Sequence, residues 1–541
     1  MKVFQLITKE IDVPYKTIFI MACVSGIANG LLIALINTGS AYAVDGRVDI
    51  SLIFAYILAV VIFVLALHYS MTHSARTTEY ALLRLKLRII DKLRYSDLRF
   101  IETHGSMSTF TPLTDGANLI SQGLSMLVTA AQSILILIFS SLYLGYLSPL
   151  TLISILVIMA LLLPIMISRN KAISSPLASA ANQDAKFFEG FFGVLKGFKE
   201  LKLNRPENDD LFSDIRKNSD TAYELKVEVN NYQAYNTLLI YTIYFLVLMA
   251  AVFAIPSIHP ESSDTIHKVT ATVLFMMAPI WPVAMALPLL SRVENVVSRL
   301  YALEESIDQA KDKTETKAPV KVAKKFDTIE CQEITFRYTD KDGSTLFTAG
   351  PFDITLKQGD LIFIVGGNGS GKSTLLKLIT GLYQPKSGSI SLNGKQINSK
   401  NYAHYRTLFA SVFTDFHLFH KLYGIPDLSA SQVNTWLKEF DLNDKTTYNE
   451  QGFSNLELST GQKKRLAIIA AILKQRPVCI LDEPAADQDP PFRRRFYTQL
   501  LPKLREMGQT IIVVSHDEQY FHLADKIIRL REGQLIAGVD S

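Results

Sequence analysis

The feature that most constrains this chain is a set of long apolar stretches in its first half. Each stretch holds about the 20 mostly apolar residues that a helix needs to cross a bilayer. The six stretches cover residues 15–37, 51–70, 122–147, 149–168, 236–256 and 269–290. No small-residue cleavage site follows the first stretch, so we expect it to remain in the membrane. The lipid bilayer is therefore the first predicted partner.

The loops between the stretches differ strongly in length and charge. Residues 71–121 and 169–235 are long and rich in Lys and Arg, whereas residues 38–50 and 257–268 are short and carry one basic residue each. Because basic loops stay on the cytoplasmic side, the pattern predicts six spans, two long cytoplasmic loops and both termini in the cytoplasm. Apolar residues at helical spacing from Glu79 onward predict that the second span continues beyond the bilayer. The alternative is a basic amphipathic helix that lies on anionic lipid.

Polar side chains within the spans are candidates for a transport path. They are Asn29, Asn37, Gln132, Tyr241 and Tyr244. Buried amides also join helices and tyrosines also mark membrane interfaces, and for each residue we favour that role over a contact with cargo. No charged residue interrupts the spans in a way that suggests a proton relay, which argues against an ion-coupled carrier.

The overall composition argues against two other classes. The 55 Lys and Arg residues and 51 Asp and Glu residues give a net charge of +4, and no basic cluster suggests a nucleic-acid partner. Cys23, Cys331 and Cys479 lie far apart, without the spacing of a disulfide framework or a metal site. We interpret all three as packing residues.

The second half changes to a pattern of strands alternating with helices. The runs DLIFIVGG, PVCILDEP and QTIIVVSHD are short and continuously apolar, as expected of buried parallel strands in an α/β domain. Before them, a stretch rich in Lys, Thr and Pro loses the apolar periodicity, which predicts a linker. The expected organisation is a transmembrane domain over 1–312, a linker over 313–328 and a soluble domain over 329–541.

The soluble half contains a complete phosphate-binding loop. Its sequence, GGNGSGKST, follows an apolar run and precedes a helical pattern, which is the context that a P-loop requires. Glycines let backbone N–H groups converge on phosphate oxygens, Lys372 reaches the outer phosphates, and Ser373 offers its hydroxyl to Mg²⁺. The predicted nucleotide-binding residues of this loop are Gly366, Asn368, Gly369, Ser370, Gly371, Lys372, Ser373 and Thr374.

An acidic pair completes the predicted site. In VCILDEP, Asp482 at a strand end can hold the Mg²⁺ shell and Glu483 can polarise the attacking water. An acidic pair at a strand end can be a coincidence, but after a P-loop it indicates an ATPase. The expected cofactors are ATP and Mg²⁺.

The stretch LELSTGQKKRLAIIAAIL narrows the class of ATPase. It resembles the signature motif of ATP-binding-cassette (ABC) ATPases, with Thr460 where a second glycine is usual. The resemblance implies that Ser459, Gly461 and Gln462 of one copy complete the ATP site of another copy. One chain carries one P-loop and one signature, so the implied assembly is a homodimer with C2 symmetry.

The same resemblance implies roles for two further residues. Tyr338, in ITFRY, corresponds to the aromatic residue that stacks on adenine in this family. His516, in VVSHD, corresponds to the histidine that contacts the γ-phosphate and would act with Glu483 in catalysis.

The layout as a whole resembles a half-transporter of the type IV ABC exporters, with an all-α six-helix membrane domain followed by an α/β cassette. Phrases such as GFKELKLN, YRTLFASVFTDFHLF and PAADQDPPFRRRFY are similar to the exporters of cyclic peptides and siderophores. That group includes exporters of lasso-peptide microcins, syringomycin-type lipopeptides and pyoverdine precursors. The resemblance implies ATP-driven export of a modified peptide or siderophore across a Gram-negative inner membrane, with the cassette in the cytoplasm. It leaves open whether an outer-membrane efflux partner takes part.

The chain departs from the usual ABC pattern where a glutamine links Mg²⁺ to the membrane domain. This chain has VFTDF at that position, so Thr414 or Asp415 must take the place of the glutamine. Asp415 can reach the metal or its water. The loop after Glu483 reads AADQD rather than the more usual SALD. Only 14 residues precede the first span, so we expect no peptidase domain that trims a leader peptide.

Three alternatives to peptide export stay open on the sequence. The same machinery could move a lipid or lipid-linked molecule between leaflets, or it could import metal-loaded siderophores. The third alternative is a membrane-tethered regulator that hydrolyses little ATP. The intact set of Lys372, Asp482, Glu483 and His516 argues against this last alternative.

Overall fold

The computed structural model describes residues 15–536, except residues 45, 47–48, 259–262, 313, 316–319, 341 and 343. Both chain ends, for which we predicted a cytoplasmic location, lie outside the described residues. The chain divides into two compact units. The first consists of Met1–Asp91 and His104–Ser306, and the second of Lys92–Thr103 and Ile307–Ser541. A short part of the first long loop therefore packs with the soluble half.

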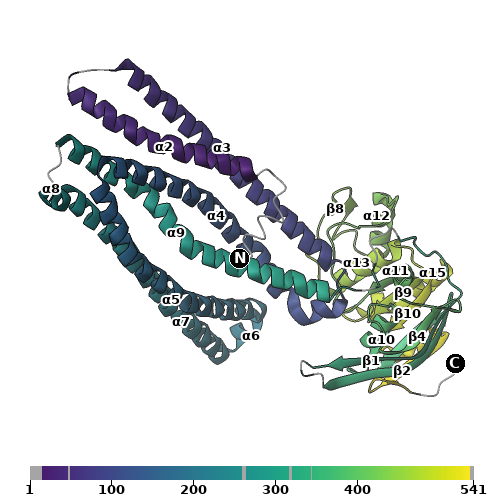
Figure 1. Ribbon diagram of the computed structural model, residues 1–541. Coiled ribbons are helices and arrows are strands. Elements are labelled where there is room, and N and C mark those ends of the chain that lie inside the picture. The colour runs from purple at the N-terminus through teal and green to yellow at the C-terminus, as the bar shows by residue number, and fades with distance from the viewer. Residues whose placement is uncertain are drawn as a thin grey trace. The chain divides into compact units, whose positions relative to one another are not determined.

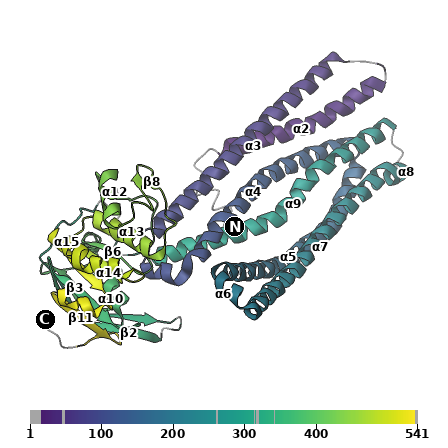
Figure 2. The same ribbon diagram turned by 180° about the vertical axis from the view of Figure 1, so that it is seen from behind.

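The first unit is built of helices, most of which are long (Figure 1, Figure 2). They are α2 (Tyr15–Val44), α3 (Ile50–Leu93), α4 (Leu98–Leu147), α5 (Pro149–Lys196), α6 (Phe198–Leu203), α7 (Arg205–Met249), the π-helix η1 (Ala250–Ala254), α8 (Ile255–Ile258) and α9 (Ser263–Gln309). The second predicted span does continue as one helix, since α3 runs unbroken over 44 residues. At 1.5 Å per residue, such a helix is about twice as long as the apolar core of a bilayer is thick.

Five helices among the described residues are long and apolar enough to cross a membrane. They are Lys16–Ala43, Ile50–Leu93, Gly116–Leu147, Arg205–Ile258 and Ser263–Gln309. The predicted stretch 149–168 forms the beginning of α5. The apolar part of α5 whose side chains are described is Pro149–Leu161. Several side chains between residues 162 and 168 are not among those that the structure describes. Ser148 alone separates α4 from α5.

Small residues let α4 lie close to its neighbours on two sides. A Cβ atom added to Gly30 would lie 2.8 Å from the Cβ atom of Phe139, and Gly26 precedes Gly30 by one helical turn. This Gly-x3-Gly spacing lets membrane helices approach each other closely. Toward α9, a side chain at Gly123 would clash with Val293. The chain thus packs α4 between α2 and α9.

The second unit has the predicted α/β core. One sheet has six strands in the order β12-β11-β3-β10-β9-β6, and another has four in the order β2-β1-β4-β5. The strands of these sheets are β1 (Thr328–Thr339), β2 (Thr345–Lys357), β3 (Leu361–Gly366), β4 (Ser387–Leu392), β5 (Lys395–Gln396), β6 (Phe409–Val412), β9 (Val478–Asp482), β10 (Thr510–Val514), β11 (Lys526–Arg531) and β12 (Gln534–Leu535). A small hairpin is formed by β7 (Tyr448–Asn449) and β8 (Gly452–Phe453).

The three apolar runs form the centre of the larger sheet. They become β3, β10 and β9, which are parallel neighbours, and every residue of β9 and β10 is buried. Helices pack around this sheet (Figure 1). They are α10 (Lys372–Ile379), α11 (Tyr402–Arg406), α12 (Ala430–Glu439), α13 (Thr460–Leu473), α14 (Pro490–Arg495), the π-helix η2 (Phe496–Leu500), α15 (Leu501–Glu506) and the 3-10 helix η3 (Glu518–Leu523).

Arg406 connects residues 312–315, which lie near the start of the second unit, to the α/β core. Its terminal nitrogens lie 2.8 Å from Asp312 Oδ2 and 2.6 Å from Glu315 Oε1, and its Nε donates to the carbonyl of Gly381. Burial raises the pKa of the Asp312 carboxyl, but hydrogen bonds from Thr314 and the charge of Arg406 outweigh burial and hold the pKa below its ordinary value. The result is an ionised pair with little solvent access.

Candidate functional site

The phosphate-binding loop lies between the end of β3 and the start of α10. Gly369 and Gly371 have φ values of +75° and +97°, a region that favours glycine, and Gly371 is the N-cap of α10. The backbone N–H groups at this helix start have no partner within the helix and suit an anion. Asn368 lies exposed at the tip of the loop, as a residue that meets a ligand should.

Lys372 folds back over the loop. Its Nζ donates to the carbonyl oxygens of Gly366 and Gly367 at 2.8 and 2.9 Å, and the side chain is buried. The ammonium group therefore already lies against the backbone that is expected to surround the phosphates. The hydroxyl of Ser370 is buried and has no hydrogen-bond partner in the described part of the chain. A loop with such a hydroxyl fits a ligand rich in acceptor oxygens.

The hydroxyl of Ser373 and the carboxylate of Asp482 are the candidate ligands for Mg²⁺. Ser373 is exposed in the first turn of α10, and Asp482 ends β9 with 4% of its surface exposed. Burial raises the pKa of Asp482, the nearby Glu483 raises it further, and a hydrogen bond from Thr414 opposes both. Hard oxygen donors of this kind suit Mg²⁺, which takes its remaining ligands from phosphate and water.

Glu483 is held in an unusual backbone conformation directly after Asp482. Its φ is +51°, in the left-handed region. Two hydrogen bonds hold this backbone: its N–H donates to the carbonyl of Val514 at 3.0 Å, and its carbonyl accepts from Lys464 Nζ at 2.7 Å. A non-glycine residue in this region is typical of functional sites, where the surrounding structure enforces it. The carboxylate lies 3.5 Å from Nε2 of His516, so the two predicted catalytic residues meet.

Tyr338 lies beside the phosphate-binding loop. Its hydroxyl is 3.1 Å from Oγ1 of Thr374, and its ring contacts Phe336 and Tyr383 edge-on. The half-buried ring thus belongs to an aromatic cluster next to the expected position of the nucleotide. Stacking on adenine remains a prediction.

The signature residues form the start of α13. Ser459 is the N-cap and makes a capping box with Gln462, in which each side chain binds the backbone N–H of the other. The carbonyl of Gly461 accepts from Gln488 Nε2 at 2.9 Å, and a Cβ at Gly461 would lie 2.5 Å from the carbonyl oxygen of Asp487. Within the described part of this single chain, no hydrogen bond joins these residues to the phosphate-binding loop. Their predicted role in the ATP site of a second copy remains a prediction.

The predicted metal ligand Asp415 and its neighbour Thr414 behave differently. Thr414 Oγ1 donates to Oδ2 of Asp482 at 2.9 Å. Asp415 is exposed and makes no side-chain hydrogen bond or ion pair within the described part of the chain. Of the two residues, Thr414 is the one that contacts Asp482. Which of them takes the place of the usual glutamine remains a prediction.

Among the polar span residues, Asn37 takes a helix-joining position. Its Nδ2 lies 3.3 Å from the hydroxyls of Tyr143 on α4 and Thr272 on α9, and from the carbonyl oxygen of Lys268. Asn37 is 4% exposed, so one amide connects three helices in a buried position. This is the role that we favoured over a contact with cargo.

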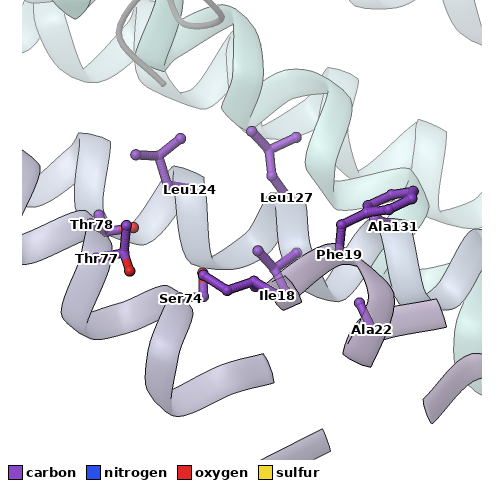
Figure 3. A pocket seen from close by; sticks show the side chains of 10 residues that line it. Ile18, Phe19, Ala22, Ser74, Thr77, Thr78, Leu124, Leu127 and Ala131 are labelled. Atoms are coloured by element: carbon purple, nitrogen blue, oxygen red, sulfur yellow. The ribbon is translucent and has the colours of Figure 1, made fainter. Parts of the chain in front are cut away.

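A cavity of about 220 Å³ lies among α2, α3 and α4 (Figure 3). Most of its lining is apolar, and the hydroxyls of Ser74, Thr77 and Thr78 line one side. None of the polar span residues singled out from the sequence lines it. One sequence feature could have indicated this cavity. Ser74, Thr77 and Thr78 are spaced three and four residues apart, which places them on one buried face of α3.

Comparisons with known proteins cover both units. The family model described as "ABC transporter transmembrane region" matches residues 17–283, and the model described as "ABC transporter" matches residues 350–486. The chain is 33% identical to the ATP-binding protein SyrD of Pseudomonas syringae pv. syringae, over 84% of this chain and 82% of that protein. It is 28% identical to the ATP-dependent lipid A-core flippase of Yersinia pestis bv. Antiqua, over 54% of this chain and 50% of that protein.

A solved structure shows the same fold over almost the whole chain. It is described as a bacterial Atm1-family ABC exporter with ATP bound. The TM-score is 0.77 and the sequence identity 17%, and the match covers 96% of this chain and 93% of that one.

Proposed function

Since the chain belongs to the ABC exporters, whose cassettes use ATP to drive transport through membrane helices, we propose that it exports a modified peptide of the cyclic, lasso or siderophore type. The main support for this class of cargo is the extent of the similarity to SyrD. The similarity spans 84% of this chain and so includes most of the membrane helices. The likeness to the lipid A-core flippase covers 54% of the chain. The phrases shared with cyclic-peptide and siderophore exporters support the same class.

We further propose that two copies form the working exporter in an inner membrane, with cassettes and termini in the cytoplasm. ABC exporters of this type usually work as dimers in a bilayer. In this chain Lys372 would hold the phosphates of ATP, while Ser373 and Asp482 would hold Mg²⁺. Glu483 would then take a proton from the attacking water, with His516 beside it. The signature residues from Ser459 to Gln462 would close the ATP site of the second copy.

Cargo and direction are tested by uptake into inside-out membrane vesicles. Labelled lasso peptides, cyclic lipopeptides and siderophores with and without iron are added with ATP, and accumulation of one class is the expected result. The control is the Glu483→Gln variant, in which accumulation should disappear. If the vesicles stay empty while labelled lipid changes leaflet in an ATP-dependent way, the flippase alternative replaces peptide export.

We propose that the segment 92–103, which includes the start of α4, is the route by which ATP use reaches the membrane helices. Glu102 accepts hydrogen bonds from Lys377 Nζ at 2.6 Å and from the Tyr383 hydroxyl at 2.5 Å. Burial and the hydrogen bond to Glu102 raise the pKa of Tyr383, so its hydroxyl stays a donor. Lys377 lies on α10, the helix that begins at the phosphate-binding loop. One carboxylate near the start of α4 thus contacts α10, the helix that follows the phosphate-binding loop.

We expect Glu102→Gln to lower transport much more than ATP turnover, because the variant loses the charged contact with Lys377 but none of the predicted catalytic residues. The pair Glu102→Lys with Lys377→Glu should restore part of the transport that each single change removes. A double-mutant cycle on transport rates should give a coupling of about 0.5–3 kcal/mol. The exposed pair Lys226–Asp184, changed in the same way, is the control. Independent, additive effects of Glu102 and Lys377 would contradict this route.

A further inference from the structure

The sheet order brings the segment after β6 next to the end of β9. The two strands are parallel neighbours, with Val412 opposite Leu481. Two residues beyond the end of β6, the chain at Thr414 therefore lies level with the end of β9, where Asp482 is found. The two residues are 68 positions apart in sequence, so this meeting depends on strand order.

The contact itself joins a hydroxyl donor to a buried carboxylate acceptor. Thr414 Oγ1 donates to Asp482 Oδ2 at 2.9 Å, and Asp482 is 4% exposed. Hydrogen bonds to carboxylates are stronger than those between neutral groups. The hydroxyl can therefore fix the orientation of the Asp482 carboxylate.

From this contact we propose that Thr414 is the positioning residue for the magnesium ligand Asp482. Its hydroxyl binds Oδ2 and so limits the rotation of the carboxylate that would hold Mg²⁺. ABC proteins usually have a glutamine that reaches toward Mg²⁺ itself. In this chain Thr414 would act on the metal indirectly, by orienting its ligand Asp482. The side chain of Asp415 is not required for that task. The inference rests on the Mg-ATP site of the proposed function and not on the cargo, so its failure would leave peptide export untouched.

The test compares an isosteric variant with one that keeps the hydroxyl. Thr414→Val removes the hydroxyl at nearly constant shape, Thr414→Ser keeps it, and Asp415→Asn removes the neighbouring charge. Each change is made in the full-length chain carrying Glu483→Gln, so that bound ATP is not consumed. Binding of Mn²⁺, as the probe for Mg²⁺, is measured at fixed ATP concentration as the loss of the free-ion electron paramagnetic resonance signal that the protein causes beyond the loss caused by ATP alone.

We expect Thr414→Val to weaken Mn²⁺ binding by about 10- to 100-fold, the usual cost of removing a group that orients a metal ligand. Thr414→Ser and Asp415→Asn should bind Mn²⁺ as the parent does. ATP binding in EDTA and the thermal unfolding midpoint should be the same in all four proteins, since a merely structural role would change these two and not the metal affinity alone.

Three outcomes would overturn the proposal. Thr414→Val could bind Mn²⁺ as tightly as the parent, or it could lose metal-free ATP binding to the same degree as Mn²⁺ binding. In the third outcome Asp415→Asn loses the metal and Thr414→Val does not, which would assign the role to Asp415. If Thr414→Val does not fold, a Thr414→Ser variant with weakened Mn²⁺ binding and normal unfolding would count against the proposal.

Discussion

Replacing Glu483 by Gln is expected to lower ATP turnover by about 10²–10⁴-fold, the usual contribution of a general base. The amide cannot take a proton from the attacking water. It has nearly the shape of the carboxylate, so the backbone at φ +51°, its hydrogen bond to the Val514 carbonyl and the hydrogen bond from Lys464 should be kept. ATP binding should persist, because neither Lys372 nor Ser373 is changed. Phosphate release by the purified full-length chain in lipid discs measures the first effect, and fluorescent nucleotide binding the second.

The matched control is Glu506→Gln, which changes an exposed carboxylate at the end of α15. Its turnover should stay at the level of the unchanged protein, since exposed positions away from such sites tolerate substitution. A Glu483→Gln variant that still hydrolyses ATP at more than a small fraction of the normal rate would remove Glu483 as the base. His516, 3.5 Å away, would then be the first residue to test for that role.

Replacing Arg406 by Met should destabilise the protein by about 3–5 kcal/mol, the cost typical of breaking a buried ion pair by removing one partner. Asp312 and Glu315 would keep their charges, and Asp312 is 8% exposed, so water cannot replace the lost guanidinium. The Gly381 carbonyl would also lose its donor. A lowered thermal unfolding midpoint and faster amide hydrogen exchange near residues 312–315 are the expected readouts.

The control for this prediction is Arg505→Met. Arg505 lies 2.8 Å from Asp525 Oδ2, but both side chains are about two-fifths exposed, at 43% and 39%. Exposed pairs contribute about 0–1 kcal/mol because solvent screens them. If Arg406→Met unfolds at the same temperature as Arg505→Met, the cluster around Arg406 does not hold the entry of the second unit in place.

The local structure around the predicted nucleotide site could be predicted because its signals are local. A run of apolar residues, a set of glycines and the pair Lys372–Ser373 specify a strand, a turn and a helix start, and the structure has β3, the loop and α10 in those places. The run that ends in Asp482 became β9 for the same reason, since a continuously apolar segment is stable as a strand only inside a sheet.

The membrane half was predictable in its helices and less so in its polar contacts. Length and hydropathy indicated the spans, and the continuation of α3 to Leu93 followed from its helical spacing. The buried hydroxyls of Ser74, Thr77 and Thr78 around a cavity were not singled out, because serine and threonine are common in membrane helices and their spacing alone does not show what faces them. The junction of α2, α4 and α9 at Asn37 likewise needs three helices in place.

By itself the sequence determined which segments are helices, which are buried strands and which loop suits phosphate, because these depend on the chemistry and spacing of neighbours along the chain. The tertiary structure alone decided which distant residues meet. It placed Thr414 rather than Asp415 on Asp482, Glu102 on Lys377 and Tyr383, and Arg406 on Asp312. Each of these contacts depends on strand order or helix packing across at least 68 positions, and the burial that brings such segments together is non-directional and leaves no local pattern in the sequence.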